Sequence, residues 1–280
     1  MIKEGEKRGG EAVPGIMPTR KEEAAPLISG YDRGKLRKAT RRLARKAHSE
    51  EVSLAVGIET SGYTAAFLLG RGYERLYPND KPIEIESIHP NMNLFDGMTV
   101  KDAMRKNNPP LFKRLFEGDE RIMVIDDFAD IGATITGVAD KLIEMGVDKR
   151  RIILATVSAE SFLAAFSYPF SMQDVRDANL SRVFRGVTSP RLKTFGDISH
   201  SIRERRIVKN PRSADELFAR AEPTDEEARQ EARLYAELEG IANGLKSFSI
   251  GDLLRKIGAN KLSFLKRRGR GIARENPDEK

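Results

Sequence analysis

The segment from Ile122 to Thr134 constrains this chain more than any other part of its sequence. Four apolar residues typical of a buried strand lead into two adjacent carboxylates, Asp126 and Asp127. A short loop follows, and Thr134 then opens a run whose apolar residues recur at helical spacing. Loop amides and a helix N-terminus favour phosphate, and paired carboxylates accept hydrogen bonds from vicinal hydroxyls. The segment therefore predicts a sugar-phosphate site, although a buried strand that simply reaches solvent would begin in the same way.

Further strand and helix patterns alternate along the chain around this segment. Residues 52–58 and 151–157 are apolar runs typical of buried strands, and residues 82–88 alternate apolar with acidic side chains, as an edge strand does. Because strands that alternate with helices form parallel sheets, we expect an α/β fold, a mostly parallel sheet flanked by helices.

The 122–134 segment resembles the ribose-phosphate loop of type I phosphoribosyltransferases. In that family an apolar strand and two acidic residues precede a small-residue loop that ends in a hydroxyl. The matching positions are two carboxylates, one glycine and one hydroxyl residue: Asp126, Asp127, Gly132 and Thr134. Ile131 stands where Thr or Ser is usual, and Ala133 where a second glycine is common. One hydroxyl that would contact phosphate is therefore missing, while the loop amides remain.

The string from Gly57 to Gly62 is similar to the pyrophosphate loop of adenine and xanthine phosphoribosyltransferases. Alone, its Thr-Ser-Gly portion would be an ordinary turn, but two matching loops in the right order support the resemblance more than either does separately. The resemblance implies a type I phosphoribosyltransferase-like fold. It also implies that pyrophosphate is bound by four loop residues: Glu59, Thr60, Ser61 and Gly62.

This family transfers a 5-phosphoribosyl group from 5-phosphoribosyl 1-pyrophosphate (PRPP) to a nucleobase, with Mg²⁺ as the cofactor. The resemblance implies PRPP and a nucleobase as partners, a place in nucleotide metabolism such as purine salvage, and a homodimer, which is frequent among members. Asp126 and Asp127 would bind the ribose hydroxyls, directly or through Mg²⁺. The 5-phosphate would be bound by the loop residues that follow: Asp130, Ile131, Gly132, Ala133 and Thr134.

The resemblance also implies a purine as the acceptor. In several purine enzymes of the family, an Asp at the offset of Asp130 contacts purine N7 as a candidate general base, and the glycosylated purine must lose a proton. We therefore expect Asp130 to act in catalysis with Asp126 and Asp127. Phe162 follows the 151–157 strand, where it either stacks on the base or fills the core.

A second function class stays open, a non-catalytic PRPP-sensing regulator that binds nucleic acid. Some proteins with this fold keep the Asp-Asp-Phe string of residues 126–128 and bind DNA. Residues 33–46 carry eight basic side chains, and residues 266–274 form a basic tail. Either stretch suits a polyanion, and either is equally compatible with plain solvation. The basic stretch lies in a predicted helix, 33–48, with one apolar stripe: Leu36, Ala39, Leu43 and Ala47.

Composition narrows the remaining possibilities. The 280-residue chain has a formal net charge of +7, which suits anionic ligands, and it has no cysteine. Disulfides, thiolate metal sites and Cys nucleophiles are therefore excluded. The first residues lack the apolar core of a signal peptide, and no apolar run approaches a membrane span of roughly 20 residues. We expect a cytoplasmic protein without a membrane partner.

The organisation expected from these patterns has five parts, with a mainly helical C-terminal extension. Capping-box sequences at Ser213 and Thr224 predict helix starts in that extension. The expected boundaries are a flexible segment at 1–30, the α/β domain at 31–170, an irregular connection or hood at 171–212, the helical extension at 213–262 and a basic tail at 263–280.

Residues 89–110 are rich in proline and asparagine and predict a long irregular segment, the place of a mobile lid. A lid there would offer Lys101, Arg105 and Lys106 to pyrophosphate. A surface helix at 99–106 is the alternative interpretation of the same residues.

Overall fold

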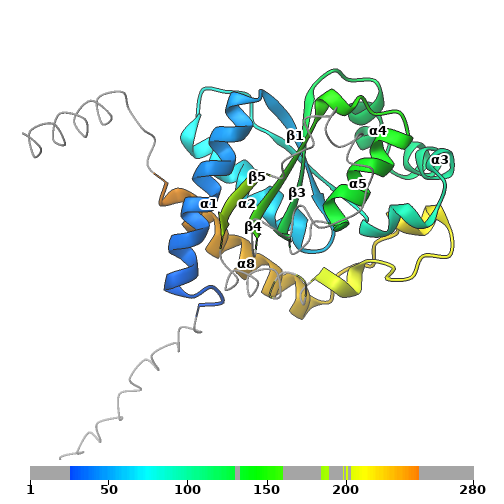
Figure 1. The fold of residues 1–280 in the computed structure, drawn as a ribbon. Coiled ribbons are helices and arrows are strands. Elements are labelled where there is room, and N and C mark those ends of the chain that lie inside the picture. The colour runs from blue at the N-terminus through cyan, green and yellow to red at the C-terminus, as the bar shows by residue number, and fades with distance from the viewer. Residues whose placement is uncertain are drawn as a thin grey trace, which may run out of the picture.

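The computed structural model describes residues 26–129, 133–159, 184–188, 198, 200 and 203–245. Its centre is one parallel sheet in the order β2-β1-β3-β4-β5 (Figure 1). The strands are β1 (Val52–Ile58), β2 (Glu84–Ile88), β3 (Arg121–Ala129), β4 (Ile152–Ala159) and β5 (Phe184–Thr188). The predicted parallel α/β class is confirmed, and β2 lies at the edge as its alternating sequence indicates.

Helices flank the sheet on both faces. The α-helices are α1 (Gly30–Ser49), α2 (Ser61–Leu76), α3 (Gly97–Asn107), α4 (Pro109–Phe116), α5 (Ala133–Glu144) and α8 (Asp225–Asn243). Short 3₁₀ helices are η1 (Pro90–Leu94), η2 (Lys149–Arg151), η5 (Glu204–Arg206) and η6 (Ala214–Phe218). Within the described ranges, no helix has both the length and the apolar character that a membrane crossing requires.

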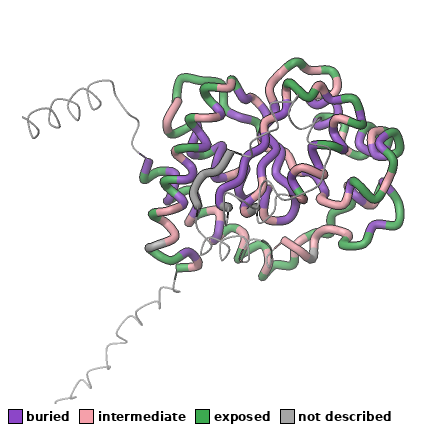
Figure 2. Tube along the Cα trace, viewed as in Figure 1, coloured by how far each residue is buried: buried purple, intermediate pink, exposed green. Residues whose placement is uncertain are grey.

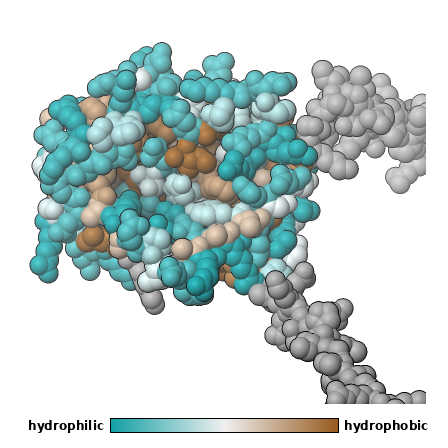
Figure 3. Space-filling view, turned by 180° about the vertical axis from the view of Figure 1, so that it is seen from behind, coloured by the Kyte–Doolittle hydropathy of each residue, from teal (hydrophilic) through white to brown (hydrophobic). Residues whose placement is uncertain are grey.

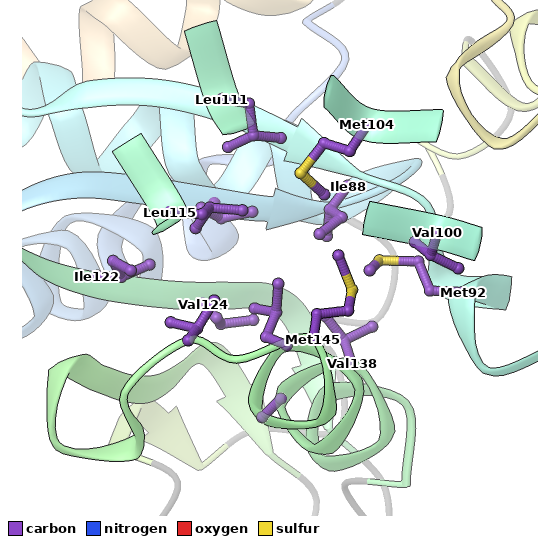
Figure 4. Packing of buried hydrophobic residues seen from close by; sticks show 14 of the residues in the cluster. Ile88, Met92, Val100, Met104, Leu111, Leu115, Ile122, Val124, Val138 and Met145 are labelled. Carbon is purple, nitrogen blue, oxygen red and sulfur yellow. The ribbon is translucent and has the colours of Figure 1, made fainter. Parts of the chain in front are cut away.

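The strands divide the core into two layers, because successive side chains of a strand point to opposite faces. Ala55 of β1 packs in the layer covered by α1, α2 and α8. Its neighbours Leu54 and Val56 pack in the layer covered by α3, α4 and α5, where Met92 and Met104 fill the space between helices (Figure 4). Strands β1, β3 and β4 are mostly buried between these layers (Figure 2), and the molecule's rear face is mostly hydrophilic (Figure 3).

Helix α1 begins where the Ser29 side chain accepts a hydrogen bond from the Asp32 amide. The predicted apolar stripe is confirmed, since all four of its residues are buried: Leu36, Ala39, Leu43 and Ala47. The opposite face carries the basic side chains, of which Arg37, Lys38 and Arg42 are exposed.

The prediction of an irregular segment at 89–110 is wrong, and the alternative prediction, a surface helix at 99–106, is confirmed by α3. Pro90 opens η1 and Pro109 opens α4, so these prolines begin helices rather than interrupt them. Proline suits the first helical turn because its missing N–H would have no partner there. Asp96 caps α3 and Asn108 caps α4, each accepting from a backbone amide.

The two predicted capping boxes differ in outcome. The Thr224 box is confirmed: Thr224 accepts from the Glu227 amide, and Glu227 accepts from the Thr224 amide at 2.9 Å. The Ser213 box is wrong, because Ser213 makes no capping hydrogen bond and the 3₁₀ helix η6 follows it. Helix α8 buries Leu234 and Leu238 in the layer that contains α1 and α2.

The strand order creates a topological switch point between β1 and β3. Helix α2 follows β1 and covers one face of the sheet, whereas α5 follows β3 and covers the other. The two connections therefore diverge at the carboxyl ends of neighbouring strands. In open parallel sheets such a crevice is the usual ligand position.

Candidate functional site

The start of α2 lies unusually close to the two strands at the switch point. A Cβ added to Gly62 would lie 2.7 Å from the Ile125 carbonyl oxygen of β3. A Cβ added to Gly57 of β1 would lie 2.5 Å from the Tyr63 backbone. Only glycine permits both approaches without moving backbone. These two glycines therefore place the loop after β1 against the end of β3.

The acidic pair lies within the last part of β3 rather than in the loop after it. Asp127 is buried, and its amide donates a hydrogen bond to Asp126 Oδ1 at 2.9 Å. The Ser61 hydroxyl donates to Asp127 Oδ1 at 2.5 Å. Residues predicted to belong to one site from two separate loops are therefore in direct contact.

Burial raises the pKa of Asp126 well above its usual range, and the adjacent Asp127 carboxyl raises it further. Two carboxylates held this close repel each other, so the pair gains from a bound cation or from hydroxyl donors. Hard carboxylate oxygens suit Mg²⁺. Among the described residues, no cluster of three or more His, Cys, Asp or Glu forms a metal cage. A magnesium ion held by this pair would draw its other ligands from substrate and water.

Helix α5 begins at Ala133, one residue earlier than predicted, and Thr134 is exposed in its first turn. The N-terminus of this helix is an electropositive end that lies after β3 on the chain. The other residues predicted for this loop and for base stacking lie outside the described residues: Asp130, Ile131, Gly132 and Phe162.

Two of the predicted pyrophosphate residues are engaged by the C-terminal part of the chain. The Thr60 hydroxyl lies 2.5 Å from His200 Nδ1. The Glu59 side chain is only 1% exposed, and its Oε1 atom lies 3.3 Å from Arg203 and 3.7 Å from Arg220. Glu59 also lines a cavity of about 320 Å³ together with Arg206.

Sequence reasoning missed these arginines. They lie more than 140 residues after Glu59, in stretches with no motif that links them to the β1 loop. The cations that were expected instead are occupied on α3. Lys101 donates to the Met145 carbonyl at 2.9 Å, and Lys106 pairs with Asp215 at 3.1 Å. Arg105 lies over the Phe112 ring.

No family model matches the sequence, and no curated protein matches it. Among solved structures, a purine phosphoribosyltransferase from Pyrococcus horikoshii is similar, with 17% identity, a TM-score of 0.30 and coverage of 46% of this chain and 75% of that chain. A hypoxanthine-guanine phosphoribosyltransferase from Bacillus anthracis is similar, with 13% identity, a TM-score of 0.33 and coverage of 60% and 85% respectively. At values this low, function has to be argued from the chain's own residues.

Proposed function

We propose that the protein binds PRPP at the switch point and transfers its 5-phosphoribosyl group to a nucleobase, releasing pyrophosphate. One observation carries the proposal: Asp126 and Asp127 sit at the carboxyl end of β3, and Asp127 accepts a hydrogen bond from Ser61, at the start of α2. PRPP has vicinal hydroxyls, which match the two carboxylates, and phosphate groups on both sides of the sugar, which match the two loop–helix units that flank the carboxylates.

Different residues of the site bind different parts of this substrate. Asp126 and Asp127 accept hydrogen bonds from the two ribose hydroxyls and fix the orientation of the ring. The amides at the start of α5, near Ala133 and Thr134, favour the 5-phosphate. The loop from Glu59 to Gly62 faces the pyrophosphate side. Holding both ends of a reactant supplies much of the rate in a reaction of this kind.

Bound Mg²⁺ would neutralise negative charge on the departing pyrophosphate. Asp126 and Asp127 are the residues that would hold it, directly or through the sugar hydroxyls. Binding the cation would also offset the repulsion within the acidic pair, which raises the pKa of Asp126 in its absence. Magnesium and PRPP should therefore bind more tightly together than either does alone.

We further propose a purine acceptor, with Asp130 as the group that takes its proton. The chemistry supports this role, because a neutral purine loses a proton as it is glycosylated. Asp130→Asn should lower turnover at least about 100-fold while changing PRPP affinity little. Equal turnover in the variant would contradict the role.

The test is pyrophosphate release from PRPP and Mg²⁺ with a panel of purine and pyrimidine bases. We expect release with one base or a few, and a loss of at least about 100-fold in the Asp126→Asn/Asp127→Asn variant. Asp102→Asn is the matched control, because that α3 carboxylate is 67% exposed and pairs with Arg105 of its own helix at 3.7 Å. Release that is equal in all three proteins would overturn the assignment.

A regulator that senses PRPP and binds nucleic acid is the second candidate function. The observation that favours it is the exposed basic face of α1, which includes Arg37, Lys38, Arg42 and Arg45. Phosphate contacts of this kind weaken steeply with salt. A gel shift with duplex DNA and with RNA, in the presence and absence of PRPP, tests it. Salt-sensitive binding that PRPP changes, without pyrophosphate release, would favour the regulator over the enzyme.

A further inference from the structure

The polar side of α1 carries a line of cations that ends in a histidine. The helix has eight basic side chains and a single acidic one, Asp32, in its first turn. Lys38, Arg42 and Arg45 are all exposed, and their spacing of four and three residues places them on one side of the helix. His48 follows Arg45 after a further three residues, in the last turn. The line from Lys38 to His48 covers roughly 15 Å of helix.

His48 belongs to an aromatic ledge, formed by the stacked rings of His48 and Tyr77. Their centroids are 3.9 Å apart, and their planes lie 10° from parallel. His48 Nδ1 lies 3.0 Å from Asp80 Oδ2, the oxygen to which the Tyr73 hydroxyl donates at 3.1 Å. The His48 side chain is nevertheless 47% exposed. Tyr77 and Asp80 therefore fix the orientation of a ring that still presents much of its surface to solvent.

Arg45 joins the cationic line to the aromatic ledge. Burial raises the pKa of the Tyr77 phenol, and the Arg45 guanidinium opposes that rise, so the cation lies close to the ring. Arg45 and His48 are also neighbours on α1, because residues three apart share a face of a helix. A positive charge and a flat ring therefore lie side by side on the surface of the protein.

The ledge lies at the opposite end of the sheet from the acidic pair. His48 precedes β1 and Glu59 follows it, and a strand of 7 residues spans roughly 23 Å. Tyr77 follows α2, which begins at the candidate site with Ser61 and whose 16 residues span about 24 Å. Both routes separate the ledge from the candidate site by on the order of 20 Å. A partner on the ledge therefore does not compete with PRPP for the same residues.

We propose that the cationic line of α1 and the aromatic ledge bind single-stranded nucleic acid. Lys38, Arg42 and Arg45 contact backbone phosphates, and an unstacked base lies on the His48 ring. Single strands are commonly held in this way, by cations that follow the backbone and rings on which bases stack. A duplex keeps its bases stacked on one another, so it can use the cations but not the ring. The inference goes beyond both proposed functions, since it requires neither PRPP nor turnover.

The experiment measures dissociation constants by fluorescence anisotropy with labelled oligo(U), oligo(dT) and a duplex of the same length. We expect a single strand to bind more tightly than the duplex, with an affinity that falls steeply between about 50 and 200 mM salt. Lys38→Gln/Arg42→Gln should weaken binding at least about tenfold and reduce its salt dependence. Arg150→Gln is the matched control, because Arg150 is 84% exposed in η2, outside α1, and pairs with Asp148. The control should bind within about twofold of the wild-type chain.

Two variants of His48 separate base stacking from charge. His48→Ala should weaken single-strand binding at least about fivefold and leave duplex binding within about twofold. His48→Phe should restore single-strand binding, because a phenyl ring offers a flat face without a positive charge. Weak binding in both variants, tighter binding of the duplex than of either single strand, or equal affinity for polyglutamate, a polyanion without bases, would each overturn the proposal.

The two single strands distinguish RNA from DNA as the partner. Tighter binding of oligo(U) assigns the surface to RNA, and tighter binding of oligo(dT) assigns it to single-stranded DNA. Pyrophosphate release should be unchanged in the Lys38→Gln/Arg42→Gln and His48→Ala variants. A chain that releases pyrophosphate but binds no oligonucleotide would overturn this inference and leave the proposed enzyme intact, whereas binding without release would do the reverse.

Discussion

At the scale of single residues, two glycines shape the candidate site as much as the carboxylates do. Gly57 and Gly62 let the first turn of α2 approach β1 and β3 closely enough for the Ser61 hydroxyl to reach Asp127. A methyl group at either position would meet backbone atoms, which cannot rotate away as a flexible side chain can. The contact between the two loops is therefore a consequence of missing side chains.

Gly62→Ala should destabilise the protein by about 1–3 kcal/mol, because its Cβ would overlap the Ile125 carbonyl and force α2 away from β3. Gly137→Ala is the matched control. Gly137 lies inside α5, where an added Cβ meets nothing within 4 Å, so alanine should stabilise by up to about 1 kcal/mol. Urea denaturation of both variants measures the difference. Equal midpoints for Gly62→Ala and the wild-type chain would contradict the packing argument.

The residues of the site were predictable to different degrees. Asp126, Asp127 and Ser61 could be found because each comes shortly after an apolar run in the sequence, which is a local pattern. Arg206 and Arg220 could not be found in the same way. They reach the β1 loop only because a bridge and α8 bring distant stretches together, and no local pattern encodes that convergence.

At the scale of elements, the helix start at Thr224 provides the cleanest test of local sequence rules. Thr224→Ala removes the hydroxyl that accepts from the Glu227 amide and donates to the Glu227 carboxylate, and it should cost about 1 kcal/mol of unfolding free energy. Ser213→Ala should cost much less, since Ser213 makes no capping bond although its sequence pattern is the same. Equal losses in urea denaturation of the two variants would show that the Ser213 side chain also caps.

Elements whose apolar residues recur at a regular spacing were predictable from the sequence. Elements whose limits are marked only by proline were not. The apolar stripe of α1 and the apolar run of β1 predict from their own sequence which side chains are buried. Pro90 and Pro109 mark loop or helix start equally well, and packing of the following side chains decides between them. Strand β5 was missed because its five residues show little alternation and gain their place by pairing with β4.

At the scale of the whole molecule, α8 joins parts of the chain that are far apart in sequence. It packs against α1 and α2 through its apolar stripe, and Glu231 and Tyr235 contribute to the cavity beside Glu59. On the same helix, Glu237 accepts hydrogen bonds from the Leu27 and Ile28 amides, at 2.7 and 3.0 Å. The helix that closes the cavity therefore also fixes the chain where it enters α1.

Glu237 should make stability depend on pH in a defined direction. Burial alone would raise its pKa, but hydrogen bonds from the Leu27 and Ile28 amides and the Arg33 guanidinium outweigh burial and lower the pKa below its usual value of 4.5. A carboxylate with a lowered folded pKa stabilises the protein above the unfolded pKa, and that stability is lost as pH falls through the folded value. Its contribution is therefore complete at neutral pH.

Glu237→Gln should accordingly cost about 1–3 kcal/mol at pH 7, because the amide cannot replace a carboxylate that accepts two backbone amides and a guanidinium. The cost should shrink below pH 4.5, where the wild-type side chain becomes protonated and loses its own advantage. Glu239→Gln is the control: this neighbour is 49% exposed and pairs with Arg71 at 3.4 Å, so its loss should stay below about 1 kcal/mol. Urea denaturation at pH values from 3 to 8, spaced by about one unit, measures both variants. A Glu237→Gln cost that is the same at every pH would mean that the charge of the Glu237 carboxylate does not stabilise the folded chain.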